Sequence, residues 1–266
     1  MFNLRPQTPR KIYFVSLLLL VSLLAGTSAA RAQQPAPPSA PPPADDPKPK
    51  TDQPQEAPAI GKSKLEQETG TINDRIFEVM PNYGTVEGFS KLPPMTTGQK
   101  YRLAAAGVFD RFTYPFIGTL AAIDQANNSP KSWGQGWGAY GKRYGATFAD
   151  NGIGTYMTTA VFPTLLKEDP RYYQIREGRV SHRALYALSR LFVTYTDDGN
   201  LRFNYSESVG NAVAAGFSNV YHPAEDRTLG RNLGTLGMLF MWDGVSNEMK
   251  EFWPDIRRKL FHKNTP

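Results

Sequence analysis

The candidates for a chemical role in this sequence are polar residues on segments that otherwise have the apolar pattern of helices. Arg143 and Asp150 are seven residues apart, so on a helix they share one face. Glu207 and Asn211 are four residues apart on a second predicted helix, with Ser218 further along the same face. If both faces turned inward, these side chains would form a buried cluster that tunes a carboxylate for acid/base catalysis, with Arg143 holding an anion.

The same residues also have structural explanations, which we favour. Asn204 and Glu207 have the spacing of a capping box, which accounts for a glutamate at a helix N-terminus. Asp150 precedes Asn151-Gly152 and is compatible with a helix end, and Arg143 with Asp150 would be an ordinary ion pair. A further polar group lies near Trp253 and raises the same question with less support: Asp243, Asn247 and Glu248.

Metal and cofactor sites have little support in the sequence. His182, His222 and His262 are too far apart to form a helical pair of ligands, and no H-E-x-x-H motif occurs. The chain has no cysteine, which excludes disulfides and zinc sites of the cysteine type. No G-x-S-x-G elbow or phosphate-binding loop is present. The sequence therefore predicts neither a metal site nor a cofactor site.

The elements that would position these residues follow an N-terminal leader, predicted over residues 1–32. Arg5, Arg10 and Lys11 precede an apolar run from residue 12 to residue 25, which ends in Ala30-Arg31-Ala32. A charged start, a short apolar middle and an A-x-A end are typical of a cleaved bacterial export signal. The alternative is an uncleaved membrane anchor over residues 12–30, but a spanning helix needs roughly 20 apolar residues. We expect an exported protein that is periplasmic or associated with the cell envelope.

The leader also explains most of the positive charge. The chain has a formal net charge of +6, and residues 1–32 contain four cationic residues and no acidic one. Cleavage would leave a charge of +2 on the rest of the chain. Export and a low residual charge both argue against a nucleic acid as partner.

A proline-rich segment separates the leader from the part expected to fold. Residues 33–58 contain ten prolines, which remove backbone donors and fix φ. We expect residues 33–69 to form a disordered, extended linker and residues 70–262 to form a single domain.

The fold predicted for residues 70–262 is a compact, mainly α bundle with one minor β-hairpin. Thr96 and Gln99 form a capping box before one helix, and Pro115 kinks or restarts it. Further helices are predicted over residues 153–167, with a kink at Pro163, over 181–192 and over 205–220. The hairpin is predicted from Asp198-Gly199 between two short apolar runs.

Two glycine-rich helices are predicted to pack against each other. Glycines and aromatic residues alternate at helical spacing from residue 133 to residue 149, and glycines recur at the same spacing from residue 230 to residue 244. Glycine costs about 1 kcal/mol against alanine inside a helix, so close packing of two backbones would be the compensation. We expect Asp226 to cap the second helix. The aromatic stripe is favoured as core, and stacking on sugar rings is the alternative.

Three strings in the chain resemble a group of bacterial exported proteins of unknown function. They are residues 138–145 (GAYGKRYG), 166–173 (LKEDPRYY) and 252–256 (FWPDI), and the resemblance covers residues 73–260. It implies export and a single domain. No activity or site residue comes with it.

The expected function is that of an exported, non-enzymatic binding or structural protein. The location suggests a cell-envelope or membrane-surface component as partner, which the sequence does not identify further. The alternative is an envelope hydrolase that uses Asp150 and Glu207 with Arg143. If that alternative holds, Arg143, Asp150, Glu207 and Asn211 must converge on one open cleft.

Overall fold

The computed structural model describes residues 63–88 and 92–261. The predicted leader (1–32) and most of the predicted linker (33–69) lie outside these residues. The last six residues of the linker range form a helix, α2 (Lys64–Thr69), with a complete capping box between Ser63 and Glu66. Thr69 is buried, so the packed part of the chain begins before residue 70.

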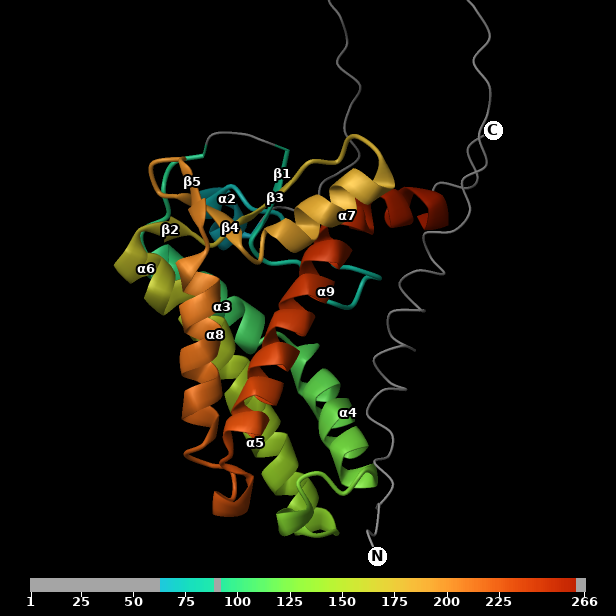
Figure 1. The fold of residues 1–266 in the computed structure, drawn as a ribbon. Coiled ribbons are helices and arrows are strands. Elements are labelled where there is room, and N and C mark those ends of the chain that lie inside the picture. Colours follow the sequence, from blue (N-terminus) through green and yellow to red (C-terminus); the bar gives the residue numbers. More distant parts are fainter. Residues whose placement is uncertain (1–62, 89–91, 262–266) are drawn as a thin grey trace, which may run out of the picture. The chain divides into compact units, whose positions relative to one another are not determined.

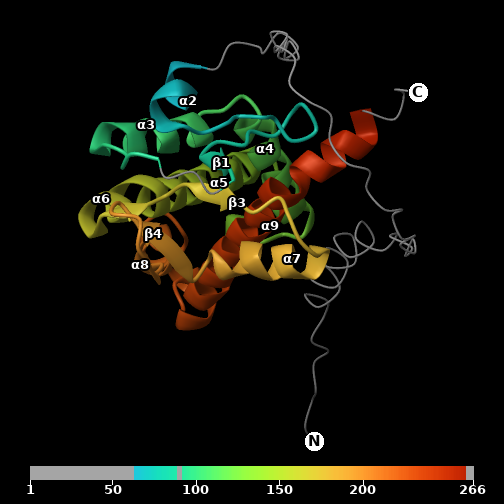
Figure 2. The ribbon, with the colours of Figure 1, turned by 90° about the horizontal axis from the view of Figure 1, so that it is seen from above.

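The described part of the chain is mainly helical, as predicted, with small sheets at one end (Figure 1). After α2, the helices are α3 (Thr97–Val108), α4 (Thr113–Ala126), α5 (Trp137–Tyr156), α6 (Phe162–Leu166), α7 (Val180–Ser189), α8 (Tyr205–Ser218) and α9 (Leu229–Phe261). Three short helical segments complete them: η1 (Lys131–Trp133), η2 (Met157–Val161) and η3 (Ala224–Asp226). Helix α5 packs against both α4 and α8, and α9 packs against both α8 and α7 (Figures 1 and 2).

Local signals in the sequence explain where several helices begin. The capping box of Thr96 and Gln99 opens α3, as predicted. Pro115 lies in the first turn of α4, where a missing N–H costs nothing, so it marks a new helix. Helix α9 is capped by Thr228, whose hydroxyl accepts a hydrogen bond from the N–H of Arg231 at 3.2 Å. The predicted cap, Asp226, lies instead in η3.

The β structure is more extensive than the one hairpin expected. Strands β4 (Val193–Thr196) and β5 (Leu201–Phe203) form that hairpin, and its turn contains Gly199 at a φ of 84°. A third strand, β2 (Glu168–Asp169), pairs antiparallel with β4. Strand β1 (Thr85–Glu87) pairs in parallel with β3 (Tyr172–Gln174), which ties the N-terminal segment to the middle of the chain.

A widened helical turn joins α5 to α6. The segment η2 is a π-helix, and it ends just before Pro163 in the first turn of α6. Proline has no N–H and its ring clashes with the carbonyl four residues earlier, here that of Thr159. A π-turn before the proline lets the chain continue from α5 into α6 without a break in the helix. The kink predicted at Pro163 is therefore present as this π-turn.

The predicted contact between the two glycine faces is wrong. A Cβ atom placed on Gly138, Gly141 or Gly145 of α5 would meet no heavy atom within 4 Å, and the same is true of Gly230, Gly234 and Gly237 of α9. Within the described residues, these faces are open. The side chains on the neighbouring faces do the packing, as where Tyr140 of α5 reaches Gly118 of α4.

No helix in residues 63–88 and 92–261 combines the length and the apolar character needed to cross a bilayer.

Substituting the open glycines should therefore stabilise the protein. We expect Gly141→Ala and Gly234→Ala each to raise the free energy of unfolding by roughly 0.5–1 kcal/mol, because alanine loses less backbone entropy in a helix. Gly210→Ala in α8 is the matched contrast, since its Cβ would lie 3.0 Å from Cγ2 of Thr158 and 3.2 Å from backbone atoms of η2. Urea unfolding of the three variants tests this. A loss of stability in Gly141→Ala would show that another surface covers the glycine face of α5.

Candidate functional site

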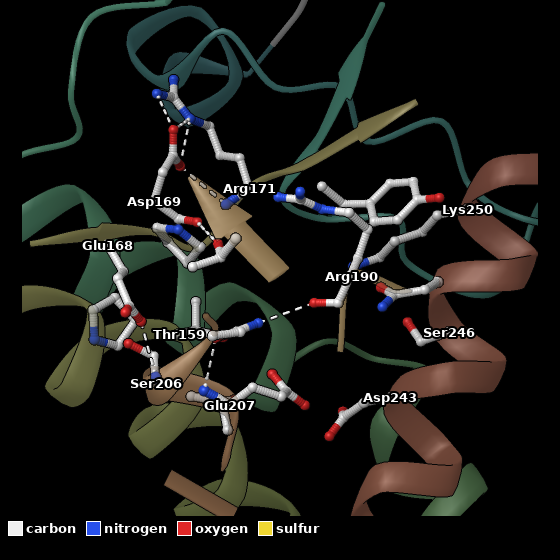
Figure 3. Close-up of a pocket in the computed structure, with 17 residues that line it drawn as sticks. Thr159, Glu168, Asp169, Arg171, Arg190, Ser206, Glu207, Asp243, Ser246 and Lys250 are labelled. Atoms are coloured by element: carbon white, nitrogen blue, oxygen red, sulfur yellow. Dashed lines mark hydrogen bonds and ion pairs between the residues drawn. The ribbon is translucent and has the colours of Figure 1, made fainter. Parts of the chain in front are cut away.

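A polar cavity lies where α8, α9, η2 and the two small sheets meet (Figure 3). Its volume is about 130 Å³. Its lining is dominated by polar and charged side chains: Thr158, Thr159, Pro163, Glu168, Asp169, Pro170, Arg171, Tyr172, Arg190, Thr194, Asn204, Ser206, Glu207, Asp243, Ser246, Asn247 and Lys250. A concave site with converging polar groups is the usual place for ligand binding.

The start of α8 places Ser206 and Glu207 at the cavity. The side chain of Asn204 caps the helix by accepting a hydrogen bond from the N–H of Glu207 at 2.9 Å. The carboxylate of Glu168, on β2, accepts a second one from the N–H of Ser206 at 2.8 Å. These bonds satisfy the first turn of α8, so the side chain of Glu207 is not needed as a cap and points to α9.

Helix α9 contributes four lining residues from one of its faces. Asp243, Ser246, Asn247 and Lys250 recur at the three- and four-residue spacing of a single helical face. The rotation of α9 that turns this face to the cavity is set by the next residue, Glu251, which is fully buried. Its carboxylate accepts hydrogen bonds from Nε of Arg183 (2.8 Å), from the hydroxyl of Tyr172 (3.0 Å) and from two backbone N–H groups after β3.

Glu207 and Asp243 form a carboxyl pair across the cavity. The amide of Asn211 donates to Oε1 of Glu207 at 3.0 Å and to Oδ2 of Asp243 at 2.9 Å. One amide thus bridges the two carboxyl groups. Two carboxylates on one bridging amide repel each other when both are ionised.

The pKa of Glu207 lies well above its ordinary value, first because burial disfavours its charged form. The negative charge of Asp243 and the hydrogen bond to it raise the pKa further, whereas the amide of Asn211 and the charge of Lys250 oppose the shift. The neutral form of Glu207 therefore persists to higher pH than that of an exposed glutamate.

Two cationic side chains at the cavity have no ionic partner among the described residues. Lys250 forms no ion pair there, and burial lowers its pKa although the charges of Asp243 and Glu207 act in the opposite direction. Arg190 is 7% exposed, and its guanidinium stacks on Tyr195, with Cζ 4.7 Å from the ring centroid. The bond between Asn204 and Arg190 in Figure 3 uses only the backbone carbonyl of Arg190.

The other charges at the cavity are satisfied by the fold. Asp169 binds the guanidinium of Arg171 at 2.7–3.0 Å and accepts the hydroxyl proton of Tyr173 at 2.7 Å. Glu168 pairs with Arg202 at 3.1 Å. These groups form rigid walls, and the carboxyl pair, Lys250 and Arg190 remain for other contacts.

Of the four candidate residues predicted from the sequence, the structure brings only two together. Glu207 and Asn211 lie together, as predicted, and their carboxyl partner is Asp243. Arg143 is 1% exposed and does not bind Asp150. Its guanidinium donates to Gln125 and to the backbone carbonyls of Ser129 (2.8 Å) and Pro130 (3.0 Å), so it fixes the loop after α4.

Asp150 accepts a hydrogen bond from the hydroxyl of Tyr221 at 2.5 Å. It lies within α5 and not at a helix end. Neither Asp150 nor Arg143 lines the cavity. The four predicted residues therefore do not converge on one cleft. The predicted hydrolase site loses Asp150 and Arg143 and keeps Glu207.

The sequence reasoning missed Lys250 and Arg190. A signal for Lys250 existed, since it continues the polar stripe of Asp243 and Asn247 by one turn on a helix with many apolar residues. Arg190 has no local signal, because it follows the end of α7 and reaches the cavity only through the tertiary fold. Within the described residues, no three histidine, aspartate or glutamate side chains are grouped so that they could hold a metal ion.

Comparison of the chain with protein-family models, with curated proteins and with solved structures found no match.

Replacing Glu207 should change how stability depends on pH. Because its folded-state pKa lies above the ordinary value of 4.5, its contribution to stability is complete below that pH and is lost as the pH rises through the folded-state value. The Glu207→Gln variant cannot undergo this loss, and its amide can still bond to Asp243. Between about pH 5 and about pH 8, we expect its free energy of unfolding to fall less than that of the wild type.

Urea unfolding at both pH values measures this difference, with Glu177→Gln as the control at an exposed glutamate. Burial and the charge of Glu251 raise the pKa of Glu248 to about 7, so some decline with pH remains in every variant that keeps Glu248. Parallel profiles for wild type and Glu207→Gln would contradict the raised pKa of Glu207.

Proposed function

We propose that the protein is an exported, non-enzymatic binding domain of the cell envelope, and that the cavity is its binding site for a small polar molecule. The observation that carries this proposal is a buried hydroxyl without a partner. Ser206 lines the cavity and is 3% exposed, and its Oγ has no hydrogen-bond partner among the described residues. A buried polar group normally has a partner, and a ligand in the adjoining cavity is the partner that we propose.

The chemistry of the lining supports a polar ligand and disfavours an apolar one. Hydroxyl, amide, carboxyl and cationic side chains all face a volume of about 130 Å³, which is room for a few non-hydrogen atoms beyond a single water. An apolar groove between α3 and α5, lined among others by Val108, Phe148 and Ile153, has no charged or amide side chain in its lining. The cavity therefore fits a small metabolite or one polar group of a larger molecule.

A hydrolase remains the second candidate, for one specific reason. A carboxyl pair in which burial and a neighbouring carboxylate raise the pKa of one member can supply a general acid and a general base. In this form the alternative uses Glu207 and Asp243 and no longer needs Asp150 or Arg143. We favour binding because the charges of the pair are held by Asn211 and faced by Lys250.

The binding proposal predicts saturable stabilisation of the full chain by small polar solutes. We expect at least one member of a panel of small sugars, amino acids, amides and carboxylates to raise the melting temperature, because a ligand that binds only the folded state stabilises it. Calorimetry with the active solute gives its affinity, and Ser206→Ala should weaken that affinity about tenfold. Ser208→Ala is the control on the same helix. Absence of any stabilising solute would contradict the proposal, and conversion of the solute during incubation would support the hydrolase.

The proposal of export predicts a processed N-terminus. We expect intact-mass analysis of the protein from its native cell to give a chain that begins at Gln33, recovered outside the cytoplasm. A chain that retains Met1 in the membrane fraction would favour the uncleaved anchor over residues 12–30. A chain that retains Met1 in the cytosol would refute export altogether.

A further inference from the structure

The charged side chains that line the proposed binding site narrow the class of ligand that it would bind. Four carboxyl groups and three cationic groups line the cavity. Asp169 with Arg171, and Glu168 with Arg202, are matched by ion pairs within the walls. What remains facing the cavity is the pair of Glu207 and Asp243 on one side and the cations of Arg190 and Lys250 on the other.

Arg190 is the residue that points most directly to a ligand. Its side chain is more than nine-tenths buried, yet within the described residues its guanidinium has no hydrogen bond and no carboxylate partner. Tyr186 and Tyr195 contact it at ring-centroid distances of 5.8 and 4.7 Å, which stabilises a cation but leaves its N–H donors unused. A guanidinium held against two rings with its donors unused is placed to bind an anionic acceptor.

Lys250 is a second cation at the same cavity. It projects from α9, while Arg190 follows the C-terminal end of α7, so two separate elements bring the charges together (Figure 3). Neither cation has an ion pair among the described residues, so both are available to an anionic group in the cavity.

We propose that Arg190 and Lys250 form a subsite for the carboxylate group of a small ligand. A guanidinium binds a planar carboxylate with two parallel N–H donors, and an ammonium adds a point charge. The two oxygens of a carboxylate fit the fork of one guanidinium, whereas the second charge of a phosphate dianion would lie in the same cavity as the carboxyl groups of Glu207 and Asp243. Ser206 supplies a hydroxyl for a further polar atom of the same ligand. This inference rests on the proposed binding function and gives it a substrate class.

The decisive comparison uses two probes of nearly equal shape on the full chain. Acetate and acetamide differ mainly in charge, and both are titrated at neutral pH with the ionic strength held constant by sodium chloride. We expect acetate to bind saturably and to raise the melting temperature, and acetamide to bind at least about tenfold more weakly. Equal binding of the two probes, or binding of acetamide alone, would overturn the carboxylate subsite and leave the proposed binding function intact. Failure of every probe, including the wider panel of polar solutes, would refute both.

Variants then assign the subsite to its residues. Arg190→Gln and Lys250→Gln should each weaken acetate binding at least about tenfold, and Arg190→Lys should restore only part of the loss because it has no fork of donors. Arg176→Gln is the control, since Arg176 is exposed and pairs with Glu87. Circular dichroism verifies that each variant keeps its helical content. If Arg190→Gln does not fold, Lys250→Gln and the two-probe comparison still decide. Undiminished acetate binding in folded Lys250→Gln would overturn the assignment.

Inorganic phosphate separates carboxylate from other anions. We expect phosphate to compete with acetate only weakly, since the second charge of its dianion would lie in the same cavity as the carboxyl groups of Glu207 and Asp243. Tighter binding of phosphate than of acetate, lost in Arg190→Gln, would replace the carboxylate by a phosphate group and overturn the proposal as stated.

Discussion

The buried carboxylate of Glu251 is the interaction on which the arrangement of the C-terminal half depends. It is fully buried on α9 and receives donors from α7, from β3 and from the backbone that follows β3. Removing these partners would leave an isolated charge in the interior, which costs several kcal/mol. This requirement fixes the rotation of α9 about its axis. The preceding residue, Lys250, and the stripe that includes Asp243 are thereby directed to the cavity.

A second group of buried charges holds the opposite wall of the cavity. The ammonium of Lys100 on α3 donates to the carbonyls of Pro163 (3.0 Å) and Glu168 (2.8 Å) and binds the carboxylate of Asp197. It joins the first turn of α6, β2 and the hairpin at one point. Satisfied buried cations thus hold together a chain that has no cysteine for disulfides. Among the buried cations of the described residues, Arg190 has no such partner, and it lines the cavity.

The sequence predicted features that depend on neighbouring residues and missed those that depend on distant ones. The capping box at Thr96, the turn at Asp198-Gly199 and the grouping of Glu207 with Asn211 are local, and the structure confirms them. Periodicity identified the glycine-rich helices but carries no information about which face meets which helix, so their mutual contact was predicted wrongly. For the same reason Arg143 was grouped with Asp150, although the carbonyls of a loop 13 and 14 residues earlier bind it. The cation of Arg190 is visible as a site residue only in three dimensions.

The parallel pairing of β1 with β3 has a consequence for the order of folding. It joins Thr85 to Tyr172, and nearby the guanidinium of Arg171 binds the carbonyls of Thr69 (2.8 Å) and Pro93 (2.9 Å). Contacts so distant along the chain lose loop-closure entropy before they gain any stabilisation. During synthesis, the N-terminal arm leaves the ribosome first, yet its partners are among the later residues to emerge. We therefore expect the arm to dock late, after the helices have formed, which keeps the chain open while its other segments assemble.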